Sequence, residues 1–489
     1  MIALGVGIFL GFNMEWYSLE KDSSYILDEC GFADFRIMSE KGFSGEDADK
    51  IRSIEGVDDV SRFLGVNMTV KDDEDILTLS VSENMKISGF IVTAGEQYDA
   101  ECKDGVWLSD KYAEANHIAI GDEMTFRYKV FEVTGVVKGL VKSGEYLICV
   151  PDETQLMPDY TTYGFFYASP EFVRSMLGTE FYSQINVVGK IEKSVFSEKV
   201  SDALGETMVI ISKDETISYA EAMGESNEGK TMAAVLPVLF LAIAVLTMVT
   251  TMHRITASEK TQIGTLKALG FKDRRIIRHY TAFGGFIGLI GTAIGIALGW
   301  WVGWFIMNPG GSMGTYLDMP DWTLKTPVFV WFVLVGIVLL LIFLSYMSVH
   351  EMLKGTAAEA LRPYTPKKMR SLFIERFGWW KKLSFGTKWN LRDSLRHKAR
   401  SFMTLFGVFG CMLLVVASFG MKDTLDVFIE QFYDSALDYE NRIYLDSRNI
   451  TSDDVDRLAL EYDADKGATA GVELNGKSVS LEIYELTHG

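Results

Sequence analysis

The chain has 489 residues, of which 48% are hydrophobic and 23% are charged, and its formal net charge is −19 at pH 7. Residues 11–230 hold 20 Lys and Arg against 42 Asp and Glu, so the rest of the chain is slightly basic. Because nucleic-acid binding requires a cationic face, this balance excludes nucleic acid as a partner. An acidic block beside apolar and basic blocks is typical of a solvated domain joined to a membrane domain.

The chain begins with an apolar stretch, residues 1–12, that a polar stretch follows. Twelve residues at a rise of ~1.5 Å each cannot cross a hydrocarbon core of ~30 Å. A signal peptide is the alternative, but the stretch lacks a basic start and a clear small-residue cleavage site. We therefore expect residues 1–12 to be the remnant of a first transmembrane helix in a fragment of a longer protein.

Residues 13–231 are predicted to form an extracytoplasmic α+β domain, because short apolar runs alternate with turn residues. Expected strands are 76–81, 89–93, 126–137 (a strand or a hairpin) and 145–150, and expected helices are 44–54, 108–116 and 169–177. Ser44 and Asp47 have the spacing of a capping box at the first of these helices. Cys30, Cys102 and Cys149 permit one disulfide, and no catalytic or metal-ligand spacing occurs.

Two motifs in this domain are interpreted as structural. The acidic run from Asp72 to Asp75 is a solvated turn; calcium binding is the weaker alternative, because no EF-hand spacing follows. Residues 224–231 fit the phosphate-loop expression G-x-x-x-x-G-K-[ST], but a short polar stretch precedes them instead of a buried strand, and their two glutamates would repel phosphate. We reject a nucleotide site, interpret 224–231 as a flexible linker, and expect no cofactor and no enzyme activity.

Four apolar runs have about the ~20 residues that cross a bilayer: 232–252, 281–307, 328–349 and 402–420. Four buried helices of this length and purity would be unusual in a soluble core. Residues 253–280 hold seven Lys and Arg and two acids, and residues 350–401 hold thirteen and four. Loops rich in Lys and Arg stay in the cytoplasm, which places both there and the acidic block outside.

Residues 257–270, which we call the coupling segment, lie between the first two runs. Ile263, Leu266 and Leu269 recur at three-residue steps and predict one apolar edge on a short helix. Gly270 is suited to end this helix, and Asp273 to cap the next. From these residues alone the segment is either an amphipathic connector or a docking helix for a soluble partner.

The run 281–307 contains glycines four residues apart, which let helices approach closely in lipid. Its glycines are Gly284, Gly288, Gly291, Gly295, Gly299 and Gly303. They indicate either tight packing within one chain or an interface that slides or dimerises, and the pattern favours neither.

The end of the chain resembles its beginning. After a basic cytoplasmic linker, 350–401, residues 402–420 are expected to be a transmembrane helix of a second repeat, and 421–489 the start of a second extracytoplasmic domain. The acidic stretch at 451–458 matches that at 44–51 with an offset of about 406 residues, which suggests duplication of a whole unit.

The coupling segment resembles the inner segment of the FtsX-like, MacB-type ABC transporter permeases. That family usually has Arg-Glu-Ile-Gly-x-x-(Arg/Lys)-Ala-(Leu/Met)-Gly, and this chain has Gln262-Ile263-Gly264-Thr265-Leu266-Lys267-Ala268-Leu269-Gly270, with Gln262 where Glu is usual. Residues 357–362 are similar to the family's Pro-x-Glu-Ala-Leu-Arg without its proline. Residues 390–405, 106–109, 120–122 and 131–137 also look like this family.

The resemblance implies a multi-pass plasma-membrane permease subunit that works with a separate ABC-type ATPase. The inner helix would receive the ATPase's motion, and the spans would transmit it to the outer domain for export or extraction of a substrate. The coupling residues would be Glu259, Lys260, Gln262, Ile263, Gly264, Lys267, Ala268 and Gly270. The alternative is a non-transporting signal transducer that regulates a cell-wall enzyme or senses peptides.

The expected fold is therefore an α-helical polytopic membrane protein with a large extracytoplasmic α+β domain. Residues 232–349 would form a three-helix membrane domain of the FtsX-like type. Its partners would be the ATPase, the lipid bilayer and a second permease half in the same full-length chain.

Overall fold

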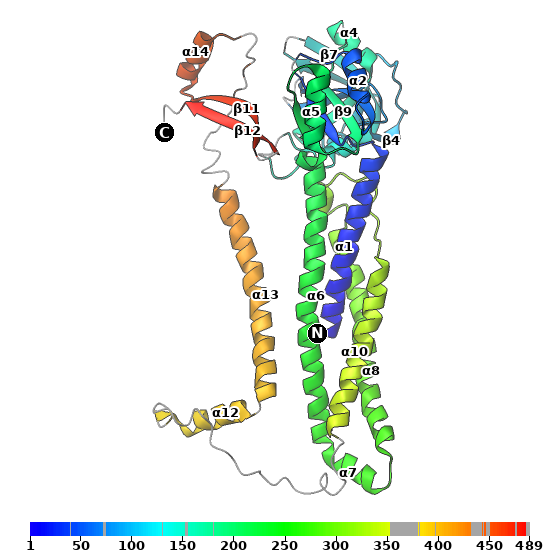
Figure 1. Ribbon diagram of the computed structural model, residues 1–489, viewed down its shortest axis with the longest axis vertical. Coiled ribbons are helices and arrows are strands. Elements are labelled where there is room, and N and C mark those ends of the chain that lie inside the picture. Colours follow the sequence, from blue (N-terminus) through cyan, green and yellow to red (C-terminus); the bar gives the residue numbers. More distant parts are fainter. Residues whose placement is uncertain are drawn as a thin grey trace. The chain divides into compact units, whose positions relative to one another are not determined.

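The computed structural model describes residues 1–352 (without 40, 72–74, 130, 152–154 and 179), 380, 382–396, 398–431, 443, 445, 450–474 and 477–485. It divides into two units. We call residues 1–14, 230–303 and 326–444 the membrane unit, and residues 15–229, 304–325 and 445–489 the outer unit. Helices α1 (Ile2–Glu29) and α6 (Ile217–Ser258) belong in part to each unit, as do the last residues of α8 (Asp273–Ile306) (Figure 1).

The outer unit is built on a ten-stranded mixed sheet in the order β10-β1-β9-β2-β3-β8-β5-β7-β4, with β6 paired to β2 and β7. The strands are β1 (Phe35–Met38), β2 (Val57–Val70), β3 (Ile76–Ser82), β4 (Ile91–Gly95), β5 (Gly105–Ser109), β6 (Glu123–Tyr128), β7 (Phe131–Lys142), β8 (Tyr163–Ala168), β9 (Gln184–Gly189) and β10 (Val209–Ser212). The long strand β2 joins the two halves, because it pairs with β9 near its start and with β3 and β6 near its end.

Each half of this sheet has its own apolar core. Helices α2 (Gly45–Arg52) and α5 (Lys193–Leu204) supply Ile51 and Phe196 to a core on β1 and β9. Helices α3 (Asp110–Ala115) and α4 (Pro170–Leu177) cover the other core, in which the rings of Phe126 and Phe166 stack with centroids 4.1 Å apart. Fully burying side chains of this size stabilises a fold by ~1.5–3 kcal/mol each.

Most short-range expectations for this domain are confirmed. Helix α2 begins after Ser44 with the full capping box to Asp47, helix α4 begins after Ser169, and residues 126–128 and 131–137 lie in β6 and β7, which form a hairpin. The strand expected at 89–93 begins at Ile91. The helix expected at 108–116 begins at Asp110, because Leu108 and Ser109 pair in β5. Most of the acidic run lies outside the described residues.

The strand expected at 145–150 is wrong. A short 3₁₀ helix, η1 (Gly144–Tyr146), occupies its start, with the Ser143 hydroxyl accepting the Glu145 N–H. The apolar residues that follow are buried without a partner strand. The Ile148 N–H instead donates to the hydroxyl of Ser218 at 3.2 Å, so a side chain far along the chain replaces the sheet bond.

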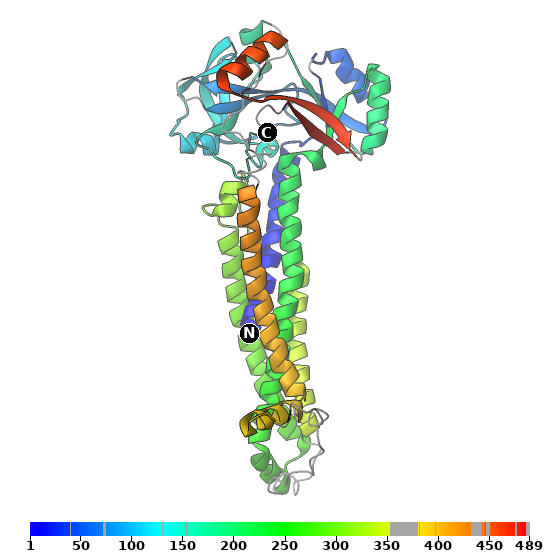
Figure 2. The ribbon, with the colours of Figure 1, turned by 90° about the vertical axis from the view of Figure 1, so that its left-hand side faces the viewer.

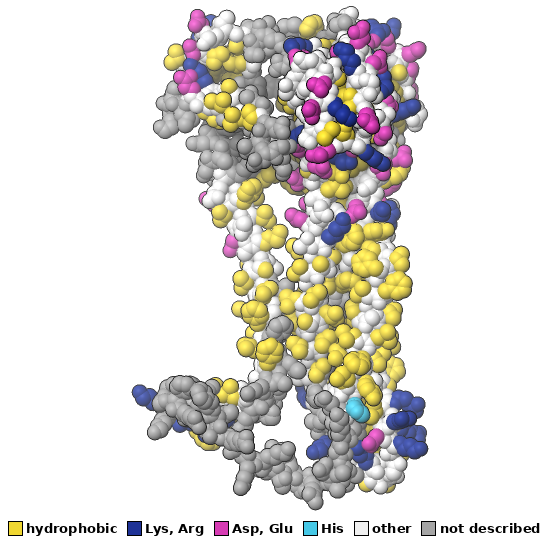
Figure 3. All heavy atoms as spheres, viewed as in Figure 1, with side chains coloured by type: hydrophobic (Ala, Val, Ile, Leu, Met, Phe, Trp, Pro, Cys, Tyr) yellow, Lys and Arg dark blue, Asp and Glu magenta, His cyan; other side chains and the backbone are white. Residues whose placement is uncertain are grey.

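Within the part of the chain that the structure describes, five helices are long and apolar enough to cross a membrane: α1, α6, α8 (Asp273–Ile306), α10 (Val328–Met352) and α13 (Lys398–Gln431). Four of them contain the predicted runs. Figure 3 shows hydrophobic side chains along the middle of these helices. Of the basic linker, residues 353–379, which include the motif at 357–362, lie outside the described residues, and helix α12 (Phe385–Arg396) is described.

The apolar remnant expected at 1–12 is the start of a longer helix. Helix α1 continues to Glu29, because the polar residues Asn13, Glu15, Ser18 and Asp22 are buried against neighbouring segments. The flexible linker expected at 224–231 is also helical, as part of α6. A phosphate loop requires non-helical backbone that presents N–H groups, so the helical geometry of 224–231 argues against a nucleotide site.

After α13 the chain forms helix α14 (Ser452–Tyr462) and a hairpin of β11 (Lys466–Leu474) and β12 (Lys477–Glu485) (Figure 2). The hydroxyl of Thr451 caps α14 with the same capping box, to Asp454, that Ser44 and Asp47 form at α2. The α2–β2–β3 order therefore recurs as α14–β11–β12. The duplication and the start inside a span stay predictions.

Candidate functional site

The coupling segment forms a short helix, α7 (Lys260–Ala268), between the ends of α6 and α8 (Figure 1). Two residues of its predicted apolar edge, Ile263 and Leu266, pack into a cluster that we call the coupling core, whereas the third, Leu269, lies outside it. This core consists of Ile255 on α6, Ile263 and Leu266 on α7, Ile276, Ile277 and Tyr280 on α8, and Val349 on α10. The coupling core therefore joins residues of α7 with residues of three membrane helices in one apolar cluster.

The turn after α7 is a Schellman motif centred on Gly270. The Phe271 N–H donates to the Leu266 carbonyl at 3.1 Å, and the Gly270 N–H donates to the Lys267 carbonyl at 3.0 Å. Gly270 has φ +85°, a left-handed conformation that glycine adopts without a steric penalty. The predicted end of the helix at Gly270 is thus confirmed. Asp273 lies in the first turn of α8 instead of capping it from outside.

Two of the expected coupling residues make contacts within the chain. The hydroxyl of Tyr280 donates to the carboxylate of Glu259. The ammonium of Lys267 pairs with the carboxylate of Asp273 at 3.1 Å, and the Lys267 side chain is only 11% exposed. Both interactions tie α7 to α8. Tyr280 and Asp273 were missed as members of this site, since no local pattern indicates which residues of α8 meet α7.

The remaining expected residues fall into a buried and an exposed group. Ile263 and Gly264 are buried in the membrane unit, whereas Lys260, Gln262, Ala268 and Gly270 are exposed. Leu269 beside them has 70% of its surface exposed. The exposed group is the part of α7 that a soluble partner can touch.

A cationic hollow of about 680 Å³ adjoins this exposed group. It is lined by Leu269, Gly270, Phe271 and Lys272 of the turn, and by Arg274, Arg275 and Arg278 at the start of α8. The Arg275 guanidinium lies 5.8 Å from the centroid of the Phe271 ring. Figure 3 shows Lys and Arg side chains gathered at this end of the helices. Such a surface is complementary to an acidic partner.

The glycine stripe on α8 faces two different helices of the membrane unit. A Cβ at Gly284 would clash with Ser345 on α10, and one at Gly288 would lie 3.4 Å from Leu341. Further along, Gly291, Gly295 and Gly299 face α1, where a Cβ would lie 2.9 Å from Ile2, 2.6 Å from Val6 and 2.6 Å from Leu10, respectively. Gly303 is also buried.

Helix α1 also contributes glycines to this contact. A Cβ at Gly7 would lie 3.1 Å from Leu298, and one at Gly11 would lie 2.7 Å from Val302. The α1–α8 contact is therefore reciprocal, with glycines on both helices receiving large side chains from the other. In lipid the hydrophobic effect does not drive helices together, so close packing of this kind stabilises the contact between them.

The outer unit holds a buried charge cluster that links the segment between α8 and α10 to the sheet. Asp318 has none of its surface exposed and pairs with the ammonium of Lys142, and it lies 3.5 Å from that of Lys111. Asp110 also pairs with Lys142, at 3.1 Å. The Lys111 ammonium donates to the carbonyls of Gly314 and Leu317, the latter at 3.0 Å. These residues lie far apart in the sequence, so no local motif predicts that they form a cluster.

Burial sets the protonation of this cluster. Burial and the charge of Asp318 raise the pKa of Asp110, and burial lowers the pKa of Lys111. For Lys142, burial alone would lower the pKa, but the carboxylates of Asp318 and Asp110 more than offset it, so its pKa is raised. Asp318 is therefore the carboxylate that opposes the effect of burial on the pKa of both lysines.

The same segment is also held to α1 within the outer unit. The carboxylate of Asp22 accepts from the Thr323 N–H at 2.8 Å and pairs with the Lys325 ammonium at 2.8 Å. Ser18 accepts from the Lys325 N–H at 2.8 Å. Among the residues that the structure describes, no three His, Cys, Asp or Glu side chains could hold a metal ion, and Cys30, Cys102 and Cys149 are free thiols.

Apolar spans, a basic inner end and a large α+β domain define a multi-pass plasma-membrane protein with an extracytoplasmic domain. Residues 234–357, which contain the coupling segment, match the FtsX-like permease C-terminal family. This match agrees with the resemblance of the inner motif to the FtsX-like ABC transporter permeases. It is 22% identical over 364 residues (69% of this chain and 84% of the other) to an uncharacterized ABC transporter permease of Methanocaldococcus jannaschii.

Two solved structures show similarity to this chain. The extracellular domain of the ABC-type transporter YknZ from Gram-positive bacteria is 15% identical, covers 36% of this chain and 97% of its own, and has a TM-score of 0.26. The periplasmic region of MacB from Actinobacillus actinomycetemcomitans is 12% identical, covers 40% of this chain and 92% of its own, and has a TM-score of 0.25.

Proposed function

We propose that this permease is driven by a separate ABC-type ATPase and that the ATPase docks on the exposed group of α7. The observation that carries the proposal is the division of α7 into a buried edge on three membrane helices and an exposed face beside a cationic hollow. A connector that only joined two spans would not need to fix its position on a third helix.

The transmission of motion follows from the same contacts. A push on α7 reaches α6, α8 and α10 through the coupling core. Helix α6 has 42 residues and, at ~1.5 Å per residue, extends over ~63 Å, so it carries a displacement without a loop in between. We infer that this motion drives export or extraction of a substrate through movement of the outer unit.

The proposal is tested by co-purifying the full-length protein with a candidate ABC-type ATPase from the same organism, and by measuring ATP turnover of the complex. Ala268→Glu places an anion on the exposed face of α7 beside the cationic hollow, and we expect it to release the ATPase. Ala94→Glu, at an exposed alanine in β4 of the outer unit, is the matched control and should retain it. Equal retention of the ATPase by both variants would contradict the docking role.

A further inference from the structure

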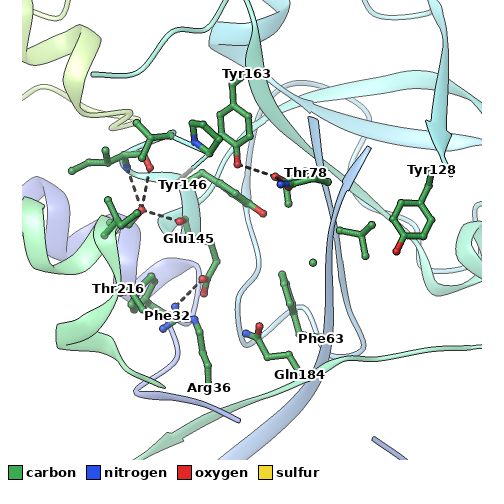
Figure 4. Close-up of a pocket in the computed structure, with 18 residues that line it drawn as sticks. Phe32, Arg36, Phe63, Thr78, Tyr128, Glu145, Tyr146, Tyr163, Gln184 and Thr216 are labelled. Atoms are coloured by element: carbon green, nitrogen blue, oxygen red, sulfur yellow. Dashed lines mark hydrogen bonds and ion pairs between the residues drawn. The ribbon is translucent and has the colours of Figure 1, made fainter. Parts of the chain in front are cut away.

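The outer unit contains a cleft of about 600 Å³ that the coupling role does not use (Figure 4). Strands β2 and β3, residues 145–151 and the first residues of α6 contribute to its walls. Small-molecule sites are typically concave and have volumes of ~300–1,000 Å³. The cleft therefore has the size of a binding site.

The walls combine aromatic faces with amide groups. Phe63, Tyr146 and Tyr163 line the cleft, and the two tyrosine hydroxyls are already bonded, to Ser80 at 2.7 Å and to Thr78 at 2.8 Å. Their rings, and not their hydroxyls, are therefore available to a ligand. Gln184 also lines the cleft; its amide nitrogen donates to Asn186, which leaves its carbonyl oxygen as an acceptor.

A buried ion pair forms part of the lining of the cleft. Arg36 and Glu145 are joined at 2.7 Å, and their side chains are 8% and 12% exposed (Figure 4). The Phe32 ring covers the guanidinium at 4.5 Å. Nη1 of Arg36 has no hydrogen-bond partner among the residues that the structure describes. Because an unpaired buried donor costs ~1–3 kcal/mol, a ligand oxygen that reaches it would relieve that cost.

The charge of the ion pair selects the kind of oxygen. The carboxylate of Glu145 neutralises Arg36, and at this depth it would repel a second carboxylate or a phosphate. An uncharged acceptor such as a peptide carbonyl meets no such repulsion. A peptide has both carbonyl acceptors and N–H donors. Its carbonyl groups can accept from Arg36, and its N–H groups can donate to the carbonyl oxygen of Gln184.

Gly65 leaves one wall open to the β2 backbone. A Cβ at this position would meet only the Phe63 ring, at an ordinary contact distance of 3.5 Å. A larger side chain would therefore project into the cleft without a clash in the sheet. The absence of a side chain at Gly65 therefore leaves room for a ligand in the cleft.

We propose that this cleft binds an uncharged peptide segment, with its carbonyl groups near Arg36, its N–H groups near Gln184 and its apolar side chains against the aromatic wall. Ser218 in the first turn of α6 donates to the Glu145 carbonyl at 2.8 Å, so the residues that hold the ion pair are bonded to α6. A bound peptide thus contacts the outer end of the helix that reaches the coupling core.

The test uses the full-length protein in detergent without ATPase or nucleotide, so its result does not depend on the proposed coupling. Dansyl-Leu-Phe-Leu-amide and the same peptide with a free carboxylate are titrated, and fluorescence anisotropy is recorded. We expect saturable binding of the amide, and at least about tenfold weaker binding of the carboxylate, since Glu145 repels it. Gly65→Leu should abolish binding, and Gly65→Ala should reduce it less.

Gly45→Leu is the matched control, because Gly45 is exposed, has no atom within 4 Å of its added Cβ and does not line the cleft. Wild-type affinity is expected for it. Unchanged binding in Gly65→Leu, equal affinity for both peptides, or no binding of the amide would each overturn the proposal. Binding of uncharged N-phenyl-1-naphthylamine without binding of the peptide amide would show an apolar-ligand site and overturn the peptide class.

Discussion

At the scale of single residues, the coupling segment separates positions that shape it from positions that a partner can reach. Lys267 and Glu259 were both expected to act in coupling, yet their charged groups are engaged with Asp273 and Tyr280 of the same chain. Gly270 is exposed but also sets the turn that directs the chain into α8. A substitution at any of these three positions is therefore expected to alter the structure of the coupling segment itself, in addition to any contact with a partner.

Gly270→Ala is expected to weaken coupling through the backbone, because the left-handed conformation costs a residue with a Cβ ~1–2 kcal/mol. No neighbouring atom lies within 4 Å of the added Cβ, so any effect is conformational and not steric. Gly270→Asn is the control, since asparagine tolerates this conformation better. ATP turnover of the assembled complex should fall for alanine and stay near wild type for asparagine. Equal turnover in both would show that the turn does not matter.

Asp318→Asn is expected to destabilise the outer unit by about 3–5 kcal/mol, because it leaves two lysine ammoniums buried without their main counter-charge. Asp110→Asn should cost much less. Its pKa is raised by burial, which means that the fold already disfavours its charged form. Thermal unfolding followed by intrinsic fluorescence measures both variants. A larger loss for Asp110→Asn would contradict this assignment of roles.

At the scale of elements, the sequence predicts a helix or strand correctly where the contacts that determine it are close in sequence. The start of α2 was predicted because Ser44 and Asp47, three residues apart, contain the whole capping interaction. The 3₁₀ helix at 144–146 was missed, because the bond that replaces a strand there comes from Ser218, seventy residues away. The Lys142–Asp318 pair spans 176 residues, and no pattern within either segment points to the other.

The helices of the membrane unit show the same division. Composition predicted four of the five candidate spans, because an apolar run is itself the signal. The length of α1 was not predictable in this way, since its second half is polar and is buried by segments remote in sequence. The sequence indicated the glycine stripe on α8, but not that one part faces α10 and the other faces α1.

Gly295→Leu is expected to destabilise the membrane unit by ~1–3 kcal/mol, because the Val6 side chain already occupies the space that a Cβ would need. Gly336→Leu, on α10, is the matched control: this glycine is exposed and has open space around it. The thermal midpoint in detergent should fall for the first variant only. If neither variant shifts it, the α1–α8 contact contributes little to stability.

At the scale of the whole molecule, the charge distribution predicts the orientation. With the acidic outer unit outside and the two basic segments inside, we expect the coupling segment to lie in the cytoplasm. The recurrence of a capped helix followed by a hairpin, in α2–β2–β3 and again in α14–β11–β12, gives the duplication suggested by the sequence a structural counterpart.

This topology predicts opposite labelling at two exposed positions. In a background without the native cysteines, Glu55→Cys should react with a membrane-impermeant maleimide in intact cells, because its side chain is 99% exposed in the outer unit. Gln262→Cys, which is exposed on α7, should react only after the cells are opened. Labelling of Gln262→Cys in intact cells would invert the assigned orientation and remove the basis for ATPase docking.

The reciprocal glycines of α1 and α8 have a consequence for how related chains can vary. Val6 occupies the place of a side chain at position 295, and Val302 occupies the place of one at position 11. A homologue that gains a larger residue at 295 must therefore carry a smaller one at 6, and one that enlarges position 11 must shrink position 302. Covariation of these two pairs across an alignment would record the contact without any further structure.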